Sequence, residues 1–211
     1  MKQTGSGIGR WRCGVKARIP LTGVMCGVLF PAIAQAHAQG AVTGGAFTGF
    51  LHPMKGPDHM LAMLAVGMWG AQLGPPCIWA LPVAFPLIMA MGGALGILGV
   101  PIPAVEPVIA VSVIVLGTLI ALAARPPVVV ATAIVGTFAV FHGYAHGAEL
   151  PEGVGSLIYS LGFVVSTGLL HVTGILIGLV TELPQGDKLL RTAGGLIAAA
   201  GLYLFTKMII S

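Results

Sequence analysis

The chain has 211 residues, of which 56% are hydrophobic and only 8% are charged, and its mean hydropathy is +0.99. A soluble domain carries roughly 25% charged residues, so the ten Lys and Arg and six Asp and Glu of this chain are too few to cover a globule of 21.4 kDa. The stretches 60–105, 126–148 and 153–181 contain no charged residue, and uncharged apolar runs of about 18 or more residues are what a bilayer span requires. The composition excludes a soluble enzyme and predicts an integral membrane protein.

The amino-terminal segment has the pattern of a secretory signal peptide. Five Lys and Arg precede an apolar run over 19–33, which ends in the overlapping small-residue patterns Ala34-Gln-Ala36 and Ala36-His-Ala38. We expect residues 1–36 to be removed; cleavage after Ala38 and an uncleaved anchor are the alternatives. Losing five basic residues changes the formal net charge from +4 to −1. The basic balance of the whole chain therefore does not predict nucleic acid or another anionic partner.

Six transmembrane helices are predicted in the mature chain, residues 37–211. Continuous apolar runs favour helices, because the strands of a membrane barrel alternate between apolar and polar residues. A first block of 33 residues is too long for one straight span, which predicts an interruption. The predicted spans lie near 41–73, 79–99, 104–124, 127–147, 155–180 and 192–210.

The charges between the spans predict the orientation. Arg125, Lys188 and Arg191 lie in the joints after spans three and five, whereas the joints after spans two and four are bordered by Glu residues without Lys or Arg. Basic residues favour the cytoplasmic side. The bias agrees with a secreted amino terminus, and predicts a multi-pass protein of the bacterial inner membrane whose mature amino terminus is periplasmic.

A first group of polar residues interrupts the first span at His52-Pro-Met-Lys-Gly-Pro-Asp58-His59. Two prolines and a glycine within five residues predict a helix break, and irregular backbone at membrane depth survives where it lines a cavity or is buried in protein. We expect unwound carbonyls over 54–56 to join His52, Asp58 and His59 as ligands. The alternative is that Asp58 caps a helix beginning at Pro57.

A second group ends the fourth span. His142 and His146 are four residues apart and share a helix face, and Glu149 follows three residues later on nearly the same face. Two imidazoles and a carboxylate suit a divalent cation such as nickel, cobalt or zinc. Ionisable residues inside a membrane are costly and usually functional, so this group predicts a metal site. Because the ligands must be deprotonated, uptake should weaken as the pH falls through the histidine range.

The motifs His52-x5-Asp58-His59 and Phe141-His142-Gly-x-Ala145-His146-Gly-x-Glu149 resemble the two signatures of the HupE/UreJ nickel/cobalt permeases. The resemblance covers the mature chain in length and in the placing of the motifs in spans one and four. It implies secondary uptake of Ni²⁺ or Co²⁺, with the metal as cargo rather than a resident cofactor, and no enzymatic activity. It also implies that the transport-critical residues are His52, Asp58, His59, His142, His146 and Glu149. Lys55 and Pro57 are atypical within the first motif, and the Lys55 cation must point away from a bound metal.

Other functions and residues stay open at this stage. A haem-binding electron-transfer subunit and a non-transporting membrane partner of a metalloenzyme assembly are the rival functions, and the oligomeric state, including a homo-oligomer, is undetermined. The chain carries no nucleotide-binding motif. His37 and His171 are candidates for secondary metal sites, with a hydrogen bond between helices as the alternative for His171. A weak echo between the starts of spans one and four suggests three-plus-three inverted repeats.

Overall fold

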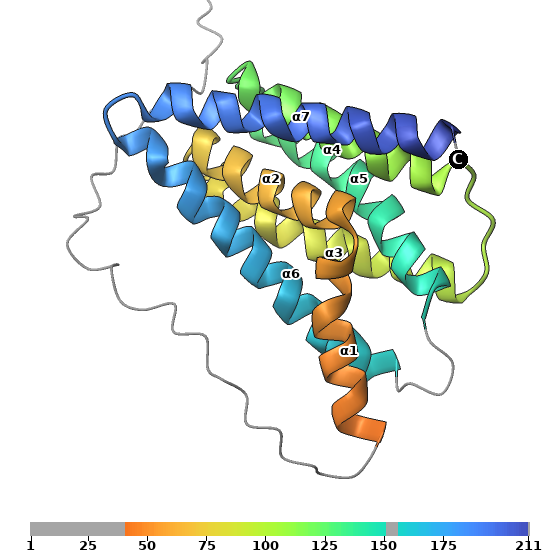
Figure 1. Cartoon of the computed structure of the whole chain (residues 1–211). Helices are drawn as coiled ribbons and strands as arrows, with labels where there is room; N and C mark the ends of the chain where they lie inside the picture. The colour runs from red at the N-terminus through yellow and green to blue at the C-terminus, as the bar shows by residue number, and fades with distance from the viewer. Residues whose placement is uncertain (1–40, 151–155, 211) are drawn as a thin grey trace, which may run out of the picture.

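The computed structural model describes residues 41–150 and 156–210, and within them the chain forms seven α-helices and one 3-10 helix (Figure 1). The 3-10 helix η2, Leu179–Glu182, continues the end of α6. The described residues form no strand, which confirms the all-α prediction. The α-helices are α1 Ala41–Lys55, α2 Pro57–Leu73, α3 Cys77–Ile97, α4 Val105–Ala121, α5 Val128–Ala148, α6 Ser156–Gly178 and α7 Gly186–Ile210.

Four helical segments of the described chain are long and apolar enough to cross a bilayer. They are α3, α5, the segment Leu157–Glu182 and α7. Helix α4 is also apolar but has only 17 residues. The protein is therefore a multi-pass membrane protein, while the number of six spans stays a prediction. The predicted signal peptide, residues 1–36, lies outside the described residues.

The interruption predicted in the first span is present, and it is confined to Gly56. Helix α1 ends at Lys55, and α2 begins at Pro57, whose fixed φ and missing N–H suit the first turn of a helix. The Gly56 carbonyl accepts a hydrogen bond of 3.0 Å from the Met60 N–H. The expected stretch of unwound carbonyls over 54–56 is therefore wrong, because Met54 and Lys55 are helical and the Gly56 oxygen already serves α2.

Helix α7 begins at Gly186, six residues before the predicted start of the sixth span at 192. Asp187 lies in its first turn, where the positive end of the helix dipole favours a carboxylate. The Arg191 Nε donates a hydrogen bond of 2.8 Å to the Ala121 carbonyl at the end of α4. Lys188 and Arg191, which the sequence places in a joint between spans, are thus part of α7. Arg191 also caps the end of α4.

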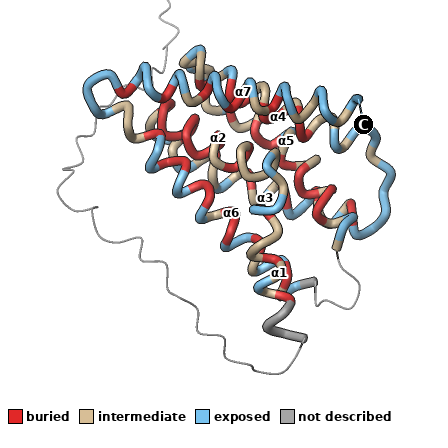
Figure 2. The backbone as a smooth tube through the Cα atoms, viewed as in Figure 1, coloured by how far each residue is buried: buried red, intermediate tan, exposed pale blue. Residues whose placement is uncertain are grey.

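Helix α2 lies at the centre of the molecule. It packs against α3, α4, α6 and α7, and nearly every residue from Ala62 to Leu73 is buried (Figure 2). A helix that is apolar on all sides is expected in such a position. The residue pair Asp58–His59 is in the first turn of this central helix, before its buried part begins at Ala62, and both side chains are partly buried.

The most extensive helix contacts are those of α6 with α1 and α2, of α3 with α5, and of α4 with α7 (Figure 1). Glycines set how closely each pair approaches. A Cβ added at Gly143 would overlap the Met89 carbonyl oxygen of α3, and one at Gly174 would overlap the Leu64 carbonyl oxygen of α2. Small residues of this kind allow close backbone contact between membrane helices.

The register of these contacts gives the relative direction of the helices. Gly92 lies against Val140 and Gly96 lies against Tyr144, so α3 and α5 run parallel. Helix α6 likewise runs parallel to α2, whereas α4 and α7 run antiparallel. In the predicted topology, α1 and α2 form span one, and α3 to α7 form spans two to six. Spans that cross the membrane in alternating directions must be parallel when both numbers are odd or both are even, and antiparallel otherwise. The pairs one–five, two–four and three–six obey this rule.

The pairing also agrees with the suggested repeat. If the two halves are related, spans one, two and three correspond to spans four, five and six. This exchange converts the pair of spans one and five into the pair of spans four and two. The same exchange leaves the pair of spans three and six unchanged. A pairing that survives this exchange is expected of two related halves of three spans.

Candidate metal site

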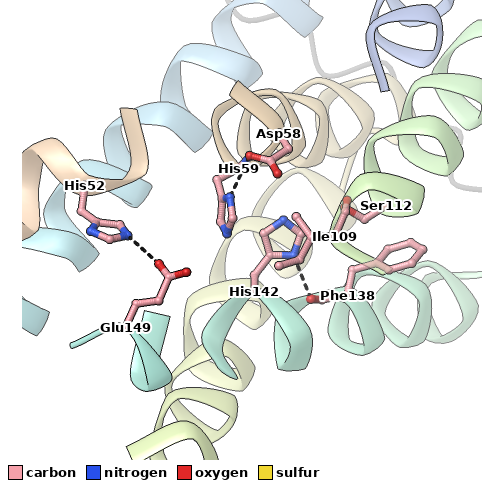
Figure 3. A network of polar contacts seen from close by, with 8 residues as sticks. All are labelled: His52, Asp58, His59, Ile109, Ser112, Phe138, His142 and Glu149. Carbon is pink, nitrogen blue, oxygen red and sulfur yellow. Dashed lines mark hydrogen bonds and ion pairs between the residues drawn. The ribbon is translucent and has the colours of Figure 1, made fainter. Parts of the chain in front are cut away.

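Three helices bring the six predicted site residues into one region, where α1 meets α2 and α5 ends. Figure 3 shows His52 and Glu149 pointing toward each other, with the Asp58–His59 pair beside His142. Chain segments about 90 residues apart in the sequence thus meet here. The residues come from α1 (His52), α2 (Asp58, His59), α5 (His142, His146) and the C-cap of α5 (Glu149).

Four imidazoles form a continuous row, which we call the histidine cluster: His52, His146, His59 and His142. The ring centroids of His52 and His146 are 4.7 Å apart, and those of His146 and His59 are 4.5 Å apart. The row ends with His59 and His142, whose centroids are 4.9 Å apart. Alternate members of the row come from α5, so the cluster holds the two motifs together.

Asp58 fixes the orientation of the His59 ring. Its Oδ1 accepts hydrogen bonds from the His59 backbone N–H at 2.8 Å and from the His59 Nδ1 at 2.9 Å. The aspartate therefore satisfies a first-turn amide, as the capping alternative predicted, and it also holds a ring of the cluster. With the proton on Nδ1, the buried His59 Nε2 carries the lone pair, and it has no partner within the described residues. A carboxylate behind an imidazole is the usual support of a histidine that binds metal.

The two histidines of α5 are the most buried members of the cluster. The His142 Nδ1 donates a hydrogen bond of 2.9 Å to the Phe138 carbonyl (Figure 3), which again leaves Nε2 with the lone pair. The His142 Nε2 and both ring nitrogens of His146 are buried and without a partner in the described part of the chain. Each such buried polar group costs about 1–3 kcal/mol. A fold that keeps several of them side by side is expected to offer them to a ligand.

The other end of the cluster is open to the surroundings. The His52 Nε2 lies 3.9 Å from the Glu149 Oε2, and the exposed fractions of the two side chains are 22% and 61%. Lys55 is exposed at the end of α1. The cluster therefore has an accessible carboxylate at one end and a buried imidazole at the other.

The described residues do not form a closed coordination shell. Among them, no three His, Cys, Asp or Glu side chains stand ready to hold one metal ion. Neighbouring rings of the row pack edge to face or tilted, with centroids 4.5–4.9 Å apart. A metal ion would bind by turning neighbouring rings toward a common point.

A cavity of about 200 Å³ lies beside His146, between α3, α5 and α6. Tyr159 and Phe163 of α6 line it, and the Phe163 and His146 rings are 4.3 Å apart between centroids. The Tyr159 ring also packs against His52, at 5.8 Å between centroids. Room beside His146 gives its ring space to turn.

The sequence interpretation assigned no role to two of the groups at this site. Glu106, in the first turn of α4, lies within electrostatic range of Asp58, His59 and Glu149. The sequence alone identifies it only as an acid at the border of a joint between spans. The other group is Tyr159, whose buried hydroxyl has no partner among the described residues. An acid at a span end is a detectable signal in the sequence, but its position next to the motifs depends on helix pairing.

The two secondary candidates fare differently. His37 lies outside the described residues. His171 of α6 is almost fully buried, and its Nδ1 donates a hydrogen bond of 3.2 Å to the Pro82 carbonyl of α3. This is the bond between helices that the sequence left as one of two alternatives. It occupies only one ring nitrogen, and the other has no partner in the described chain.

Together, these features define a helical multi-pass membrane protein with a histidine cluster between its spans. The family model described as HupE / UreJ protein matches residues 24–204. Protein HupE of Rhizobium leguminosarum bv. viciae is 42% identical over 184 residues, which cover 87% of this chain and 96% of that protein. The chain belongs to the HupE/UreJ family, which confirms the resemblance drawn from its two motifs. No solved structure gave a significant match.

Proposed function

We propose that the protein is a secondary transporter that takes up Ni²⁺ or Co²⁺ across the bacterial inner membrane. The histidine cluster, with Asp58 and Glu149, binds the ion. The observation that carries the proposal is the row of four imidazoles, within which the His59, His142 and His146 Nε2 atoms are buried and unpartnered in the described residues. Membership of a family associated with nickel and cobalt transport supports it.

The chemistry of the cluster fits borderline divalent cations. Neutral imidazoles suit nickel, cobalt and zinc, and carboxylates add charge that offsets the loss of hydration. Glu149 and His52 at the accessible end take the first contact with the hydrated ion, and His146 and His59 then replace part of its water. A row of ligands without a closed shell holds the ion with an affinity low enough for release.

The transport domain comprises residues 37–211 and, in this proposal, six spans that follow a cleaved signal peptide of residues 1–36. The parallel and antiparallel helix pairs support alternating spans, and Arg125, Lys188 and Arg191 favour a cytoplasmic location for the ends of α4 and α6. This orientation puts the histidine cluster toward the periplasm, where it would capture metal from outside.

The geometry favours transport over haem binding. Two axial histidines of a haem stand on opposite faces of the macrocycle, whereas the His59 ring packs against His142 and against His146 at 4.9 and 4.5 Å. Imidazoles in mutual contact leave no place for a porphyrin between them. A structural partner of a metalloenzyme assembly would carry the family fold without metal uptake, so an uptake measurement separates that function.

Uptake of labelled Ni²⁺ in cells that lack other nickel importers tests the proposal. His146→Ala and His59→Ala should each reduce uptake by roughly tenfold or more, since metal-ligand loss of this kind abolishes or strongly weakens binding. Thr137→Ala is the matched control on α5, because its hydroxyl is exposed and bonds to the Ala133 carbonyl of the same helix. Uptake by the control should equal that of the wild type at equal membrane amounts.

Wild-type uptake by both histidine variants would refute the proposal. If the proposal holds, competition of labelled Ni²⁺ with unlabelled Co²⁺ in wild-type cells determines the preferred cargo. Ligand chemistry alone does not distinguish the two ions.

A further inference from the structure

A second set of buried polar groups lies on α6, outside the histidine cluster. We call it the α6 polar cluster: Ser166, Thr167 and His171. Ser166 and Thr167 are fully buried and His171 is 1% exposed. The Ser166 Oγ, the Thr167 Oγ1 and the His171 Nε2 have no hydrogen-bond partner within the described residues. Thr167 and His171 are four residues apart and share one face of the helix.

The hydroxyls of this cluster differ from those of four other threonines on the helices. Exposed Thr118 and Thr173 donate hydrogen bonds of 2.7 and 2.8 Å to the carbonyl four residues earlier in their own helix. Thr137 and Thr192 do the same at 2.9 Å. Thr167 and Ser166 lack this bond, although it is available to any helical hydroxyl. The buried hydroxyls are therefore left open to another partner, at the cost of an unsatisfied group.

The His171 ring is held in a defined orientation by a proline. Pro86 has no N–H, so the Pro82 carbonyl four residues earlier receives no hydrogen bond from within α3. The His171 Nδ1 donates to this carbonyl, and the lone pair is then on Nε2. His59 and His142 have the same arrangement, with Nδ1 bonded and Nε2 open. An imidazole fixed through Nδ1 by a backbone carbonyl is a common support for metal binding through Nε2.

One aromatic ring separates the two clusters. The Phe85 centroid is 5.5 Å from that of His142 and 5.3 Å from that of His171. On α6, Phe163 packs against His146 and lies one turn before Thr167. The α6 polar cluster is thus the next set of ligand atoms beyond the buried end of the histidine cluster.

We propose that Thr167 and His171 form a second, transient binding site for the divalent metal ion, which receives the ion from the histidine cluster. The inference rests on the proposed transport function. The His171 Nε2 supplies a nitrogen and the Thr167 Oγ1 an oxygen, while water completes the shell and the Ser166 hydroxyl adds a further polar contact. This site contains no carboxylate, so it binds metal more weakly than the histidine cluster and releases it readily.

Metal binding and uptake of four variants test this second site. Purified wild-type protein titrated with Ni²⁺, and separately with Co²⁺, should bind about two ions, the second more weakly. His171→Asn keeps a donor near Nδ1 for the Pro82 carbonyl but removes Nε2, so it should lose the weaker ion and reduce uptake by roughly tenfold. Thr167→Val should weaken the same ion severalfold. Thr173→Val is the control on α6, because its hydroxyl is exposed and bonds to Leu169, and should match the wild type.

His146→Ala distinguishes this site from the proposed function. It should lose the tighter ion and transport, and keep the weaker ion. If His171→Asn keeps wild-type uptake and both ions while His146→Ala loses transport, the second site is wrong and the transport proposal stands. If His146→Ala also transports normally, the transport proposal itself fails. A single bound ion in the wild-type protein would overturn the second site as well.

Discussion

The histidine cluster and the α6 polar cluster show how one fold presents imidazoles in two different ways. In the first, four rings stand in a row with Asp58 and Glu149, and the Glu149 side chain is 61% exposed. In the second, one ring stands with two hydroxyls, and every member is at most 1% exposed. Charge and access suit the capture of an ion from water, whereas neutral buried oxygen and nitrogen atoms suit its passage and release.

The support of the imidazoles differs in the same way. Asp58 holds His59 through a carboxylate, while the Pro82 carbonyl holds His171 through the backbone. A carboxylate makes an imidazole a stronger ligand than a neutral carbonyl does. The difference predicts tighter binding at the histidine cluster, and the following substitutions change one cluster at a time.

The largest effect is expected from Asp58→Asn. The amide retains an acceptor for His59 but loses the negative charge beside the ion, so uptake and the affinity of the tighter ion should fall by about 10–100-fold. The weaker ion should be unaffected. Asp187→Asn, in the exposed first turn of α7, is the same chemical change away from both clusters. Equal loss of both ions in Asp58→Asn would show that the clusters are not independent sites.

Gly143→Ala should damage the histidine cluster through its scaffold. The added Cβ would overlap the Met89 carbonyl oxygen, so α5 must move away from α3 and carry His142 and His146 with it. Overpacking of this kind costs typically 1–3 kcal/mol. Gly168→Ala, beside Thr167 on α6, has open space around the new methyl group. Thermal unfolding should show a clear fall in Tm for Gly143→Ala alone, and similar Tm values for both would contradict the packing.

Pro86→Ala should act on the α6 polar cluster by a smaller amount. The new N–H at residue 86 would bond to the Pro82 carbonyl within α3 and compete with His171. A carbonyl accepts two hydrogen bonds, so the His171 bond is weakened rather than lost, and the weaker ion should bind about threefold to tenfold less tightly. Pro82→Ala is the control, because its N–H reaches the Ile78 carbonyl instead. Equal effects of the two would mean that the kink, not the free carbonyl, matters.

Pro82 and Pro86 illustrate which contacts the sequence predicts and which it does not. The break at Gly56 and the shared face of His142 and His146 could be predicted, because both depend on the chain within one or two helical turns. The bond between His171 and Pro82 could not, because it depends on which helices pack together. The spacing of Pro82 and Pro86 was a usable signal for a free carbonyl, but it does not identify the donor.

The other contacts around the candidate site also depend on which helices pack together. The glycines of α3 and α5 are visible in the sequence, yet nothing local states that Gly143 lies against Met89 rather than against another span. Glu106 was missed for the same reason, because its closeness to Asp58 and His59 arises from the packing of α4 on α2. The motifs therefore identified the candidate ligands, and the fold added their neighbours.

The smallest predicted effect is that of Lys55→Gln. Lys55 is exposed and its charge acts on the accessible end of the histidine cluster, where water and salt weaken the interaction. Removing the cation should tighten the tighter ion by only about twofold to fourfold at low salt, and less as salt is added. The weaker ion, which is further from Lys55 and enclosed by helices, should not respond. Lys207→Gln, at the exposed end of α7, provides the control for net charge. An equal response of both ions would show that the α6 polar cluster senses surface charge as the histidine cluster does, which contradicts the division between a charged capture site and a neutral release site.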